Sequence, residues 1–543
     1  MAASIPLEDL DMTLALARAD DWRTYGVVTE ESTATVKWAA GEPSSGMVLG
    51  GLVARGRELA ALDRAFVMAR RGQSDVVVLR GDPGTGNSSL VQAAMGRARD
   101  FRNVALRGTL YVEGSVPEGG WPQPIIDLLH EFSPLEPTAE PDSPVVQAMV
   151  GALTRLAGHS LAPLLLSVDD CHLLPGWFTV ALAHAIGALG STPIVLVLSA
   201  STLAGTTMAS DEELGVTSYR LKSLTVKQAK LLLDLRSDRM PVPRVLLELV
   251  QRTGGNPEAL LDVCNRLNAE ELGGHRELPD PLPLGSHLVA KFARRFEELP
   301  EDTRQALSVV SAGRIPFDAL KRTLSDLGIS EDDLKPAQRD GQLEASRDRI
   351  EFRHPIERSA IYWLSSEEAR SKAHTAVAKV LLEQNRVELA SYHATRCEKG
   401  KNNALARLHF EAARIAIDRG DPEEAARHHE AASEFAESSE ATAHHLVLAA
   451  ALLMSLGRLD RALTYLDRAT QLDPSDHLRG QAAYLEARAR WSNDVDPELA
   501  DEMIAAADLC EGDATDWAAM MLIDATACLL MIGAPAAAVS VAE

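Results

Sequence analysis

The sequence is poor in aromatic residues, in cysteines and in signals for export. Aromatic residues make up 4% of its 543 residues, and long stretches rich in Ala, Leu, Glu and Arg fill its second half, which favours helices there. Its five cysteines are scattered and form no Cys-x-x-Cys pair, so neither a disulfide framework nor a zinc framework is expected. The first residues lack a basic region followed by an apolar core, and we therefore expect a cytoplasmic protein.

Basic charge and long apolar runs are also scarce. There are 54 Lys and Arg against 78 Asp and Glu, a formal charge of −24, and such a surface repels the phosphates of nucleic acids. The longest apolar stretches, Leu446–Leu456 and Ala518–Val541, are short or interrupted by Asp524 and Pro535. A membrane span is therefore not expected.

The first 222 residues divide into an arm and an α/β domain. Residues 1–46 are acidic and rich in turn-forming residues, which predicts a flexible arm. From 47 to 222, short β-branched runs alternate with helical stretches, and this alternation predicts a doubly wound parallel sheet. The predicted strands are Val76–Leu79, Val104–Leu106, Pro163–Val168 and Pro193–Leu198.

The remaining residues are predicted to be mainly helical. Residues 223–283 form a helical lid that ends in the linker 279–284, and residues 284–365 combine helices with a β-like pair, which suggests a winged helix. A helical connector, 366–405, precedes residues 406–543, where short turns recur with spacings of 37, 38 and 38 between matching alanines. This period predicts a tetratricopeptide-like α-solenoid, which stops here without a polar capping helix, as if truncated. The matching alanines are Ala425, Ala462, Ala500 and Ala538.

A glycine-rich loop follows the first predicted strand. The segment Gly81–Ser89 (GDPGTGNSS) lies between that strand and a helix, which is the context of a phosphate-binding loop. In such a loop, backbone N–H groups and the helix N-terminus bind phosphate. The pattern G-x-x-x-x-G-K-[ST] fails at one position, because Asn87 stands in place of the lysine that contacts the β- and γ-phosphates. Ser88 remains where a hydroxyl would hold Mg²⁺.

Two carboxylates end another predicted strand. The segment Leu164–Asp170 is apolar and then acidic, which is the form of a Walker B motif. Asp169 is predicted to orient Mg²⁺ through water, and Asp170 to polarise an attacking water. The alternative is that both are ordinary strand-end carboxylates. Cys171 and His172 are interpreted as loop residues beside the site and not as a metal pair.

These motifs, together with Leu52–Leu59 (LVARGREL), Thr253–Pro257 (TGGNP) and Phe352–Tyr362 (FRHPIERSAIY), resemble the STAND class of signal-transduction NTPases. Within that class, the chain is similar over about residues 50–540 to the large LuxR-type, MalT-like transcriptional regulators of high-GC bacteria. The resemblance implies a multidomain α/β plus α fold: a P-loop AAA+ domain, a helical lid, a winged helix and a tetratricopeptide-like solenoid. The C-terminal helix-turn-helix domain of those regulators is not in this sequence.

The resemblance also implies roles for individual residues. Val53 and Arg55 would flank the adenine, although Ala54 and Gly56 depart from the family pattern. Pro257 would pack on the base and His354 would reach the β-phosphate, the alternatives being a turn proline and a structural histidine. No arginine follows Ile194–Leu198 to sense a γ-phosphate. The phosphates of ATP or ADP and the Mg²⁺ ion would be held by Gly81, Gly84, Thr85, Gly86, Asn87, Ser88 and Ser89, with Asp169 as the second metal ligand.

Three functions fit these features. The first is the sensor module of a STAND-type LuxR-family regulator, a nucleotide-dependent switch with little ATP turnover. Its solenoid would bind an inducer or a protein partner, and it would bind promoter DNA only through a C-terminal domain absent here. The second is an active P-loop ATPase, and the third is an interaction scaffold with a vestigial NTPase core. The apolar residues of Trp517–Val539 further predict self-association.

Overall fold

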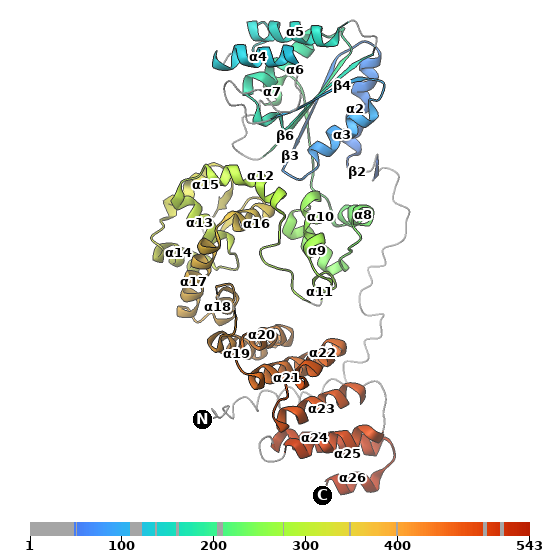
Figure 1. The fold of residues 1–543 in the computed structure, drawn as a ribbon, viewed down its shortest axis with the longest axis vertical. Coiled ribbons are helices and arrows are strands. Elements are labelled where there is room, and N and C mark those ends of the chain that lie inside the picture. The colour runs from blue at the N-terminus through green and yellow to red at the C-terminus, as the bar shows by residue number, and fades with distance from the viewer. Residues whose placement is uncertain are drawn as a thin grey trace. The chain divides into compact units, whose positions relative to one another are not determined.

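The fold consists of two compact units (Figure 1). The sheet-containing unit consists of residues 48–317 and 328–370, and the repeat unit consists of residues 318–327 and 371–542. The predicted arm, residues 1–46, lies outside the described residues, and so does Asn493-Asp494, where one of the recurring turns is predicted. The computed structural model describes residues 48–49, 52–108, 122–135, 138–158, 162–202, 210–274, 276–346, 349–397, 400–491, 497–510 and 515–542.

A five-stranded, all-parallel sheet forms the centre of the sheet-containing unit, in the order β4-β5-β6-β3-β7. The four predicted strands are confirmed, each within a few residues of its predicted ends. The three-residue strand β7 and a small hairpin, β1–β2, were not predicted, because segments this short show no periodicity. The strands are β1 (Val48–Leu49), β2 (Leu52–Val53), β3 (Asp75–Gly81), β4 (Arg102–Arg107), β5 (Leu164–Asp169), β6 (Ile194–Ser201) and β7 (Ser218–Arg220).

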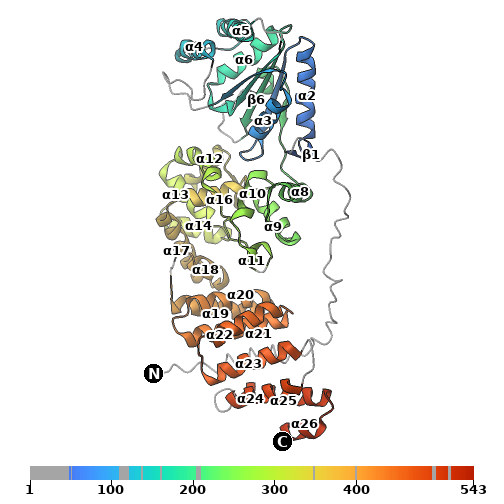
Figure 2. The same ribbon diagram turned by 45° about the vertical axis from the view of Figure 1, so that its right-hand side comes forward.

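Helices cover both faces of this sheet, as Figure 2 shows. Leu165 packs with α2 and α3, whereas its neighbours Leu164 and Leu166 pack with α4, α5 and α6 on the other face. Successive side chains of a strand point to opposite faces, so a continuous apolar run is what a sheet covered on both faces requires. The elements are α2 (Gly56–Arg70), α3 (Asn87–Arg97), α4 (Gln123–Phe132), η2 (Ser133–Leu135), α5 (Pro144–Ala157), η3 (Cys171–Leu173), α6 (Gly176–Ala188) and α7 (Asp211–Leu214).

The rest of this unit consists of a group of helices, which lies where the lid is predicted and is called the lid below, and a helix–hairpin segment. The predicted linker, residues 279–284, packs against the rest of this unit, because Leu282 is buried and the buried Asp280 pairs with Arg358 at 2.8 Å. The lid contains α8 (Val226–Arg236), α9 (Pro243–Thr253), α10 (Pro257–Arg266) and α11 (Ala269–Leu272). The helix–hairpin segment contains α12 (Ser286–Glu297), α13 (Glu301–Ser311), η4 (Glu331–Leu334), α15 (Lys335–Arg339), β8 (Leu343–Ala345), β9 (Ile350–Phe352) and α16 (Pro355–Leu364).

Paired helices build the repeat unit. The four alanines of the 37–38-residue period are all buried, and each is the fourth residue of the second helix in its pair, so the period marks where helices pack closely. The helices are α14 (Phe317–Asp326), α17 (Glu367–Glu383), α18 (Val387–Ala394), α19 (Asn403–Asp418), α20 (Pro422–Phe435), α21 (Ser439–Ser455), α22 (Leu459–Thr470), α23 (Asp476–Trp491), α24 (Pro497–Cys510), α25 (Thr515–Met531) and α26 (Pro535–Ala542).

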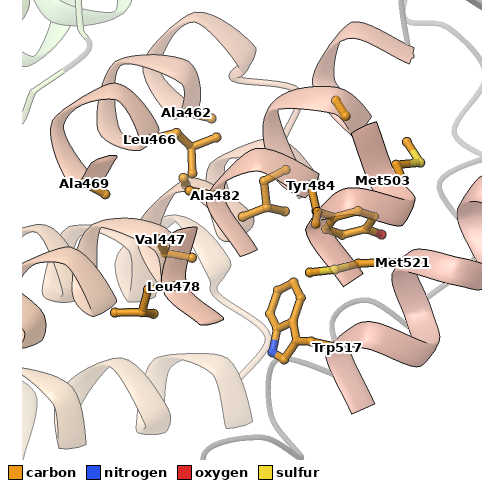
Figure 3. Close-up of a cluster of buried hydrophobic side chains, with 14 of the residues drawn as sticks. Val447, Ala462, Leu466, Ala469, Leu478, Ala482, Tyr484, Met503, Trp517 and Met521 are labelled. Atoms are coloured by element: carbon orange, nitrogen blue, oxygen red, sulfur yellow. The ribbon is translucent and has the colours of Figure 1, made fainter. Parts of the chain in front are cut away.

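The last repeats share one apolar core. Figure 3 shows Trp517 and Met521 of α25 directed toward Tyr484 of α23, and the rings of Trp517 and Tyr484 meet edge to face at 6.1 Å. The Tyr484 hydroxyl donates to Asp524 at 2.7 Å. The carboxylate that interrupts the apolar stretch Ala518–Val541 therefore has a hydrogen-bond partner within the repeats. Among the described helices, none is long and apolar enough to cross a membrane.

Candidate nucleotide-binding site

The glycine-rich loop joins β3 to α3 and ends in two glycines with left-handed backbone conformations. Gly84 has φ 84° and Gly86 has φ 103°, values that favour glycine because it lacks Cβ. Gly86 is the N-cap of α3, and no side-chain hydrogen bond caps this helix. The first N–H groups of α3 are therefore not satisfied by a capping side chain, and with the helix dipole they suit an anion.

Asn87 uses its side chain to hold the loop in place. Its Nδ2 donates to the backbone oxygens of Gly81 (3.0 Å) and Ala200 (3.1 Å), which joins the start of the loop to the end of β6. Its Oδ1 is buried and accepts no hydrogen bond from the described residues. The position therefore contributes a structural tie but no positive charge.

Arg55 holds the loop from another side. Its guanidinium donates to the backbone oxygens of Thr85 (2.7 Å) and Lys222 (3.1 Å), and thus links the loop to the residues that precede the lid. The side chain is buried, and this burial lowers the pKa of Arg55, an effect that the nearby Glu58 opposes. Val53 is buried in a cluster that it shares with Leu224 and other apolar residues of the lid.

The two predicted Walker B carboxylates lie at the end of β5 and differ in their partners. Asp169 accepts a hydrogen bond from the Ser199 hydroxyl on β6. Asp170 has φ 52° and pairs with Arg107 of β4 at 3.4 Å. Ser88, the other predicted metal ligand, is exposed at the start of α3. Within the described ranges, no three His, Cys, Asp or Glu side chains are arranged to hold a metal ion.

The lid contacts the tip of the loop through the turn that contains Pro257. Asn256 donates from Nδ2 to the backbone oxygen of Pro83 at 2.7 Å, and the backbone N–H of Glu258 donates to Gly84 at 3.2 Å. A Cβ at Gly84 would lie 2.5 Å from Asn256 Oδ1, so this approach requires glycine. Pro257 is the first residue of α10, between the two contacts.

His354 of the helix–hairpin segment reaches the same loop. Its Nδ1 lies 3.4 Å from Asp82 Oδ2, and the Thr202 hydroxyl donates to the other oxygen of Asp82. A cavity of about 170 Å³ lies where the loop, the lid turn and this segment meet. Its lining includes Asp82, Thr85, Ser223, Asn256, Phe292 and His354.

The structure thus brings the loop, Arg55, the Pro257 turn and His354 together, while the carboxylates of Asp169 and Asp170 lie at the end of a strand that is separated from β3 by β6. The sequence interpretation missed Asp82, Asn256 and Ser199. Asn256 had a detectable signal, because Asn before Pro at a helix start is a typical N-cap. No local sequence pattern shows that the Ser199 hydroxyl donates to Asp169, or that Asp82 accepts from Thr202.

Comparison with known proteins assigns the loop and its sheet. Residues 51–198 match the family model of the AAA ATPase domain. This region is an AAA ATPase domain. The match covers the phosphate loop and the Asp169-Asp170 strand end. No curated protein matches the chain.

The solved structures that match this chain include ATPases, all at low sequence identity. A STAND protein with a tetratricopeptide repeat sensor from Pyrococcus horikoshii is 16% identical, with a TM-score of 0.23, over 87% of this chain and 74% of that chain. A Walker-type ATPase of Pyrococcus abyssi is 13% identical, with a TM-score of 0.36, over 58% and 97%. The RuvB Holliday junction branch migration motor of Thermotoga maritima is 18% identical, with a TM-score of 0.31, over 58% and 97%.

Proposed function

We propose that the chain is a nucleotide-dependent switch that binds ADP or ATP at the glycine-rich loop and hydrolyses ATP no faster than background. One observation carries this proposal: three segments distant in sequence contact the same loop. Arg55 bonds Thr85, Asn256 bonds Pro83, and His354 faces Asp82. A ligand that displaces or reinforces these contacts changes how the lid and the helix–hairpin segment are held.

The residues of the site are better suited to binding the phosphates of a nucleotide than to catalysing ATP hydrolysis. The loop offers backbone N–H groups and an α3 N-terminus that no side chain caps, and Ser88 and Asp169 would hold Mg²⁺, which would neutralise phosphate charge. Asn87 ties the loop to β6 but brings no cation to the transferring phosphate. Asp170, which would polarise the attacking water, is paired with Arg107.

At a finer level, we propose the sensor module of a STAND-type, LuxR-family transcriptional regulator in the cytoplasm. In this view the helix–hairpin segment is a winged helix that responds to nucleotide, and the tetratricopeptide-like repeats bind an inducer or a protein partner. Promoter DNA would be bound by a helix-turn-helix domain outside this sequence. The order of loop, carboxylate strand, lid turn and His354 segment supports this proposal.

Calorimetric titration of the purified chain with ADP and Mg²⁺ tests the proposal. We expect saturable binding of one ADP, weakened by His354→Ala because the imidazole at the loop is lost. His130→Ala is the matched control, since His130 is an exposed histidine on α4, and it should leave the affinity unchanged. Absence of ADP binding at millimolar concentration would refute a nucleotide-dependent switch.

A further inference from the structure

A buried carboxylate, three residues after His354 in the chain, has a hydrogen-bond partner within the described part of the chain for only one of its two oxygens. Glu357, in the first turn of α16, has 1% of its surface exposed. Arg295 of α12 donates from Nη1 to Glu357 Oε1 at 2.9 Å. The other oxygen, Oε2, is buried and has no hydrogen-bond partner among the described residues. A buried, ionised carboxylate normally needs partners for both oxygens.

One guanidinium serves two carboxylates in this cluster. Arg295 also bonds the side chain and the backbone oxygen of Asp340, at the end of α15. The side chain of Gln342 donates to Asp340 at 3.0 Å, which adds a hydrogen bond but no charge. Arg353 is adjacent, but its guanidinium is directed to the exposed Glu344 at 3.0 Å. Among the described residues, Arg295 is therefore the only guanidinium that donates a hydrogen bond to either carboxylate, while Arg353 acts on Glu357 only through its charge.

The glycine-rich loop adds a negative charge that acts on Glu357. Burial is the main cause that raises the pKa of Glu357 to about 7, the negative charges of Asp340 and Asp82 add to it, and the positive charges of Arg295 and Arg353 oppose it. Asp82 belongs to the glycine-rich loop and lies 3.4 Å from His354. The backbone N–H of Glu357 donates to the oxygen of His354 at 3.0 Å. Glu357 is thus within electrostatic range of the loop and joined to the residue that contacts it.

We propose that Glu357 is a proton-binding site coupled to the glycine-rich loop, so that the binding of a nucleotide diphosphate or triphosphate takes up a proton from solvent onto Glu357 Oε2. This inference rests on the proposed function. A phosphate on the loop adds negative charge near Asp82 and disfavours the ionised form of Glu357. By linkage, a protonated Glu357 favours phosphate binding to the same extent. Glu357 therefore acts as a positioning residue that makes the switch sensitive to pH near neutrality.

Calorimetry with ADP between pH 6 and pH 8, in buffers of different ionisation enthalpy, measures both the affinity and the protons taken up. A coupling of one pKa unit makes ADP binding about fivefold weaker at pH 8 than at pH 6, because neither pH lies far from the pKa of about 7. Glu357→Gln, which stays neutral, should keep the low-pH affinity throughout and lose the proton uptake. Glu351→Gln is the matched control, because Glu351 is an exposed glutamate on β9, and it should behave like the wild type. The titration of ADP itself is common to all three proteins.

Equal proton uptake and equal pH dependence in wild type and Glu357→Gln would overturn the proposal, since the proton would then bind at a site other than Glu357. If the wild type binds no ADP, the proposed function fails, and thermal unfolding without nucleotide still tests the proton site. The wild type should lose stability relative to Glu357→Gln as the pH rises from about 5 to above 7, because the pKa of Glu357 is higher in the folded state. A constant difference would refute the site. If Glu357→Gln does not fold, Asp340→Asn should move the pH midpoint of ADP affinity to lower pH, and an unmoved midpoint would refute the coupling.

Discussion

Asn256 performs two separable tasks, and removing them separately tests how the lid is held on the loop. Its Oδ1 caps α10 by accepting from the Ala259 N–H at 3.1 Å, and its Nδ2 donates to Pro83 at 2.7 Å. Asn268 caps α11 in the same lid by accepting from the Glu271 N–H at 2.9 Å. Asn256→Ala removes a cap and a contact to the loop, whereas Asn268→Ala removes a cap.

The two substitutions differ by the energy of the contact to Pro83. Loss of an N-cap costs about 1 kcal/mol, and loss of a buried hydrogen bond that leaves its acceptor unpartnered costs about 1–3 kcal/mol more. Asn256 is buried, so both terms apply in full. Asn256→Asp separates them, because a carboxylate still caps α10 but has no donor for Pro83. The loop should therefore loosen in Asn256→Ala and Asn256→Asp but not in Asn268→Ala.

Amide hydrogen exchange of peptides that cover residues 81–90 measures this loosening. A contact worth about 1.4 kcal/mol gives roughly tenfold faster exchange when it is lost, provided that exchange proceeds through local opening. Equal exchange in Asn256→Asp and wild type would show that the Asn256 side chain does not hold the loop. Equal acceleration in Asn256→Ala and Asn268→Ala would show that only helix capping matters.

Four further outcomes are expected. ATP turnover should equal background, because loss of one charged contact to the transferring phosphate lowers the rate by about 10²–10³; robust turnover abolished by Asp170→Ala would contradict this, and Asn87→Lys should raise the rate. The repeat unit should lose stability on acidification, because burial lowers the pKa of His409 and His445 to about 3. Keeping each of these two histidines neutral at pH 5 lowers the free energy of unfolding by about 2 kcal/mol, against an unfolded pKa near 6.5. Circular dichroism between pH 7.5 and 5 checks this, and an unchanged melting temperature would refute it. Light scattering should detect self-association of the wild type, reduced by Ile523→Ser, Leu530→Gln and Met531→Gln, because these apolar side chains are 67%, 56% and 59% exposed. Leu235→Gln, at an exposed position on α8, is the control and should leave the self-association unchanged. A monomeric wild type at tens of micromolar would refute the argument. Gel shifts at physiological salt should show weak DNA binding, because residues 406–543 contain 25 Asp and Glu against 10 Lys and Arg; sub-micromolar, sequence-specific binding would overturn this expectation.

The helical repeats show how far periodicity alone can predict a fold. Ala425, Ala462, Ala500 and Ala538 were matched by spacing, and all four are buried at the same position of the second helix in their pairs. Small residues recur there because close helix packing leaves no room for larger ones. Which apolar residues of α25 face outward did not follow from the sequence, because almost every position of that helix is apolar: Met521 is buried, whereas Leu530 is exposed.

The sequence by itself determined the parallel strands, the glycine-rich loop and the missing lysine at Asn87. Those features depend on local rules: strands buried on both faces are continuously apolar, left-handed turns favour glycine, and a charge is either present or absent at a position. Only the tertiary structure decided what Asn87 does instead, because its partner Ala200 is 113 residues away. The same holds for the contact of Asn256 with Pro83 and for the half-satisfied Glu357. Hydrogen bonds and burial between distant segments arise from chain topology, and no local pattern encodes them.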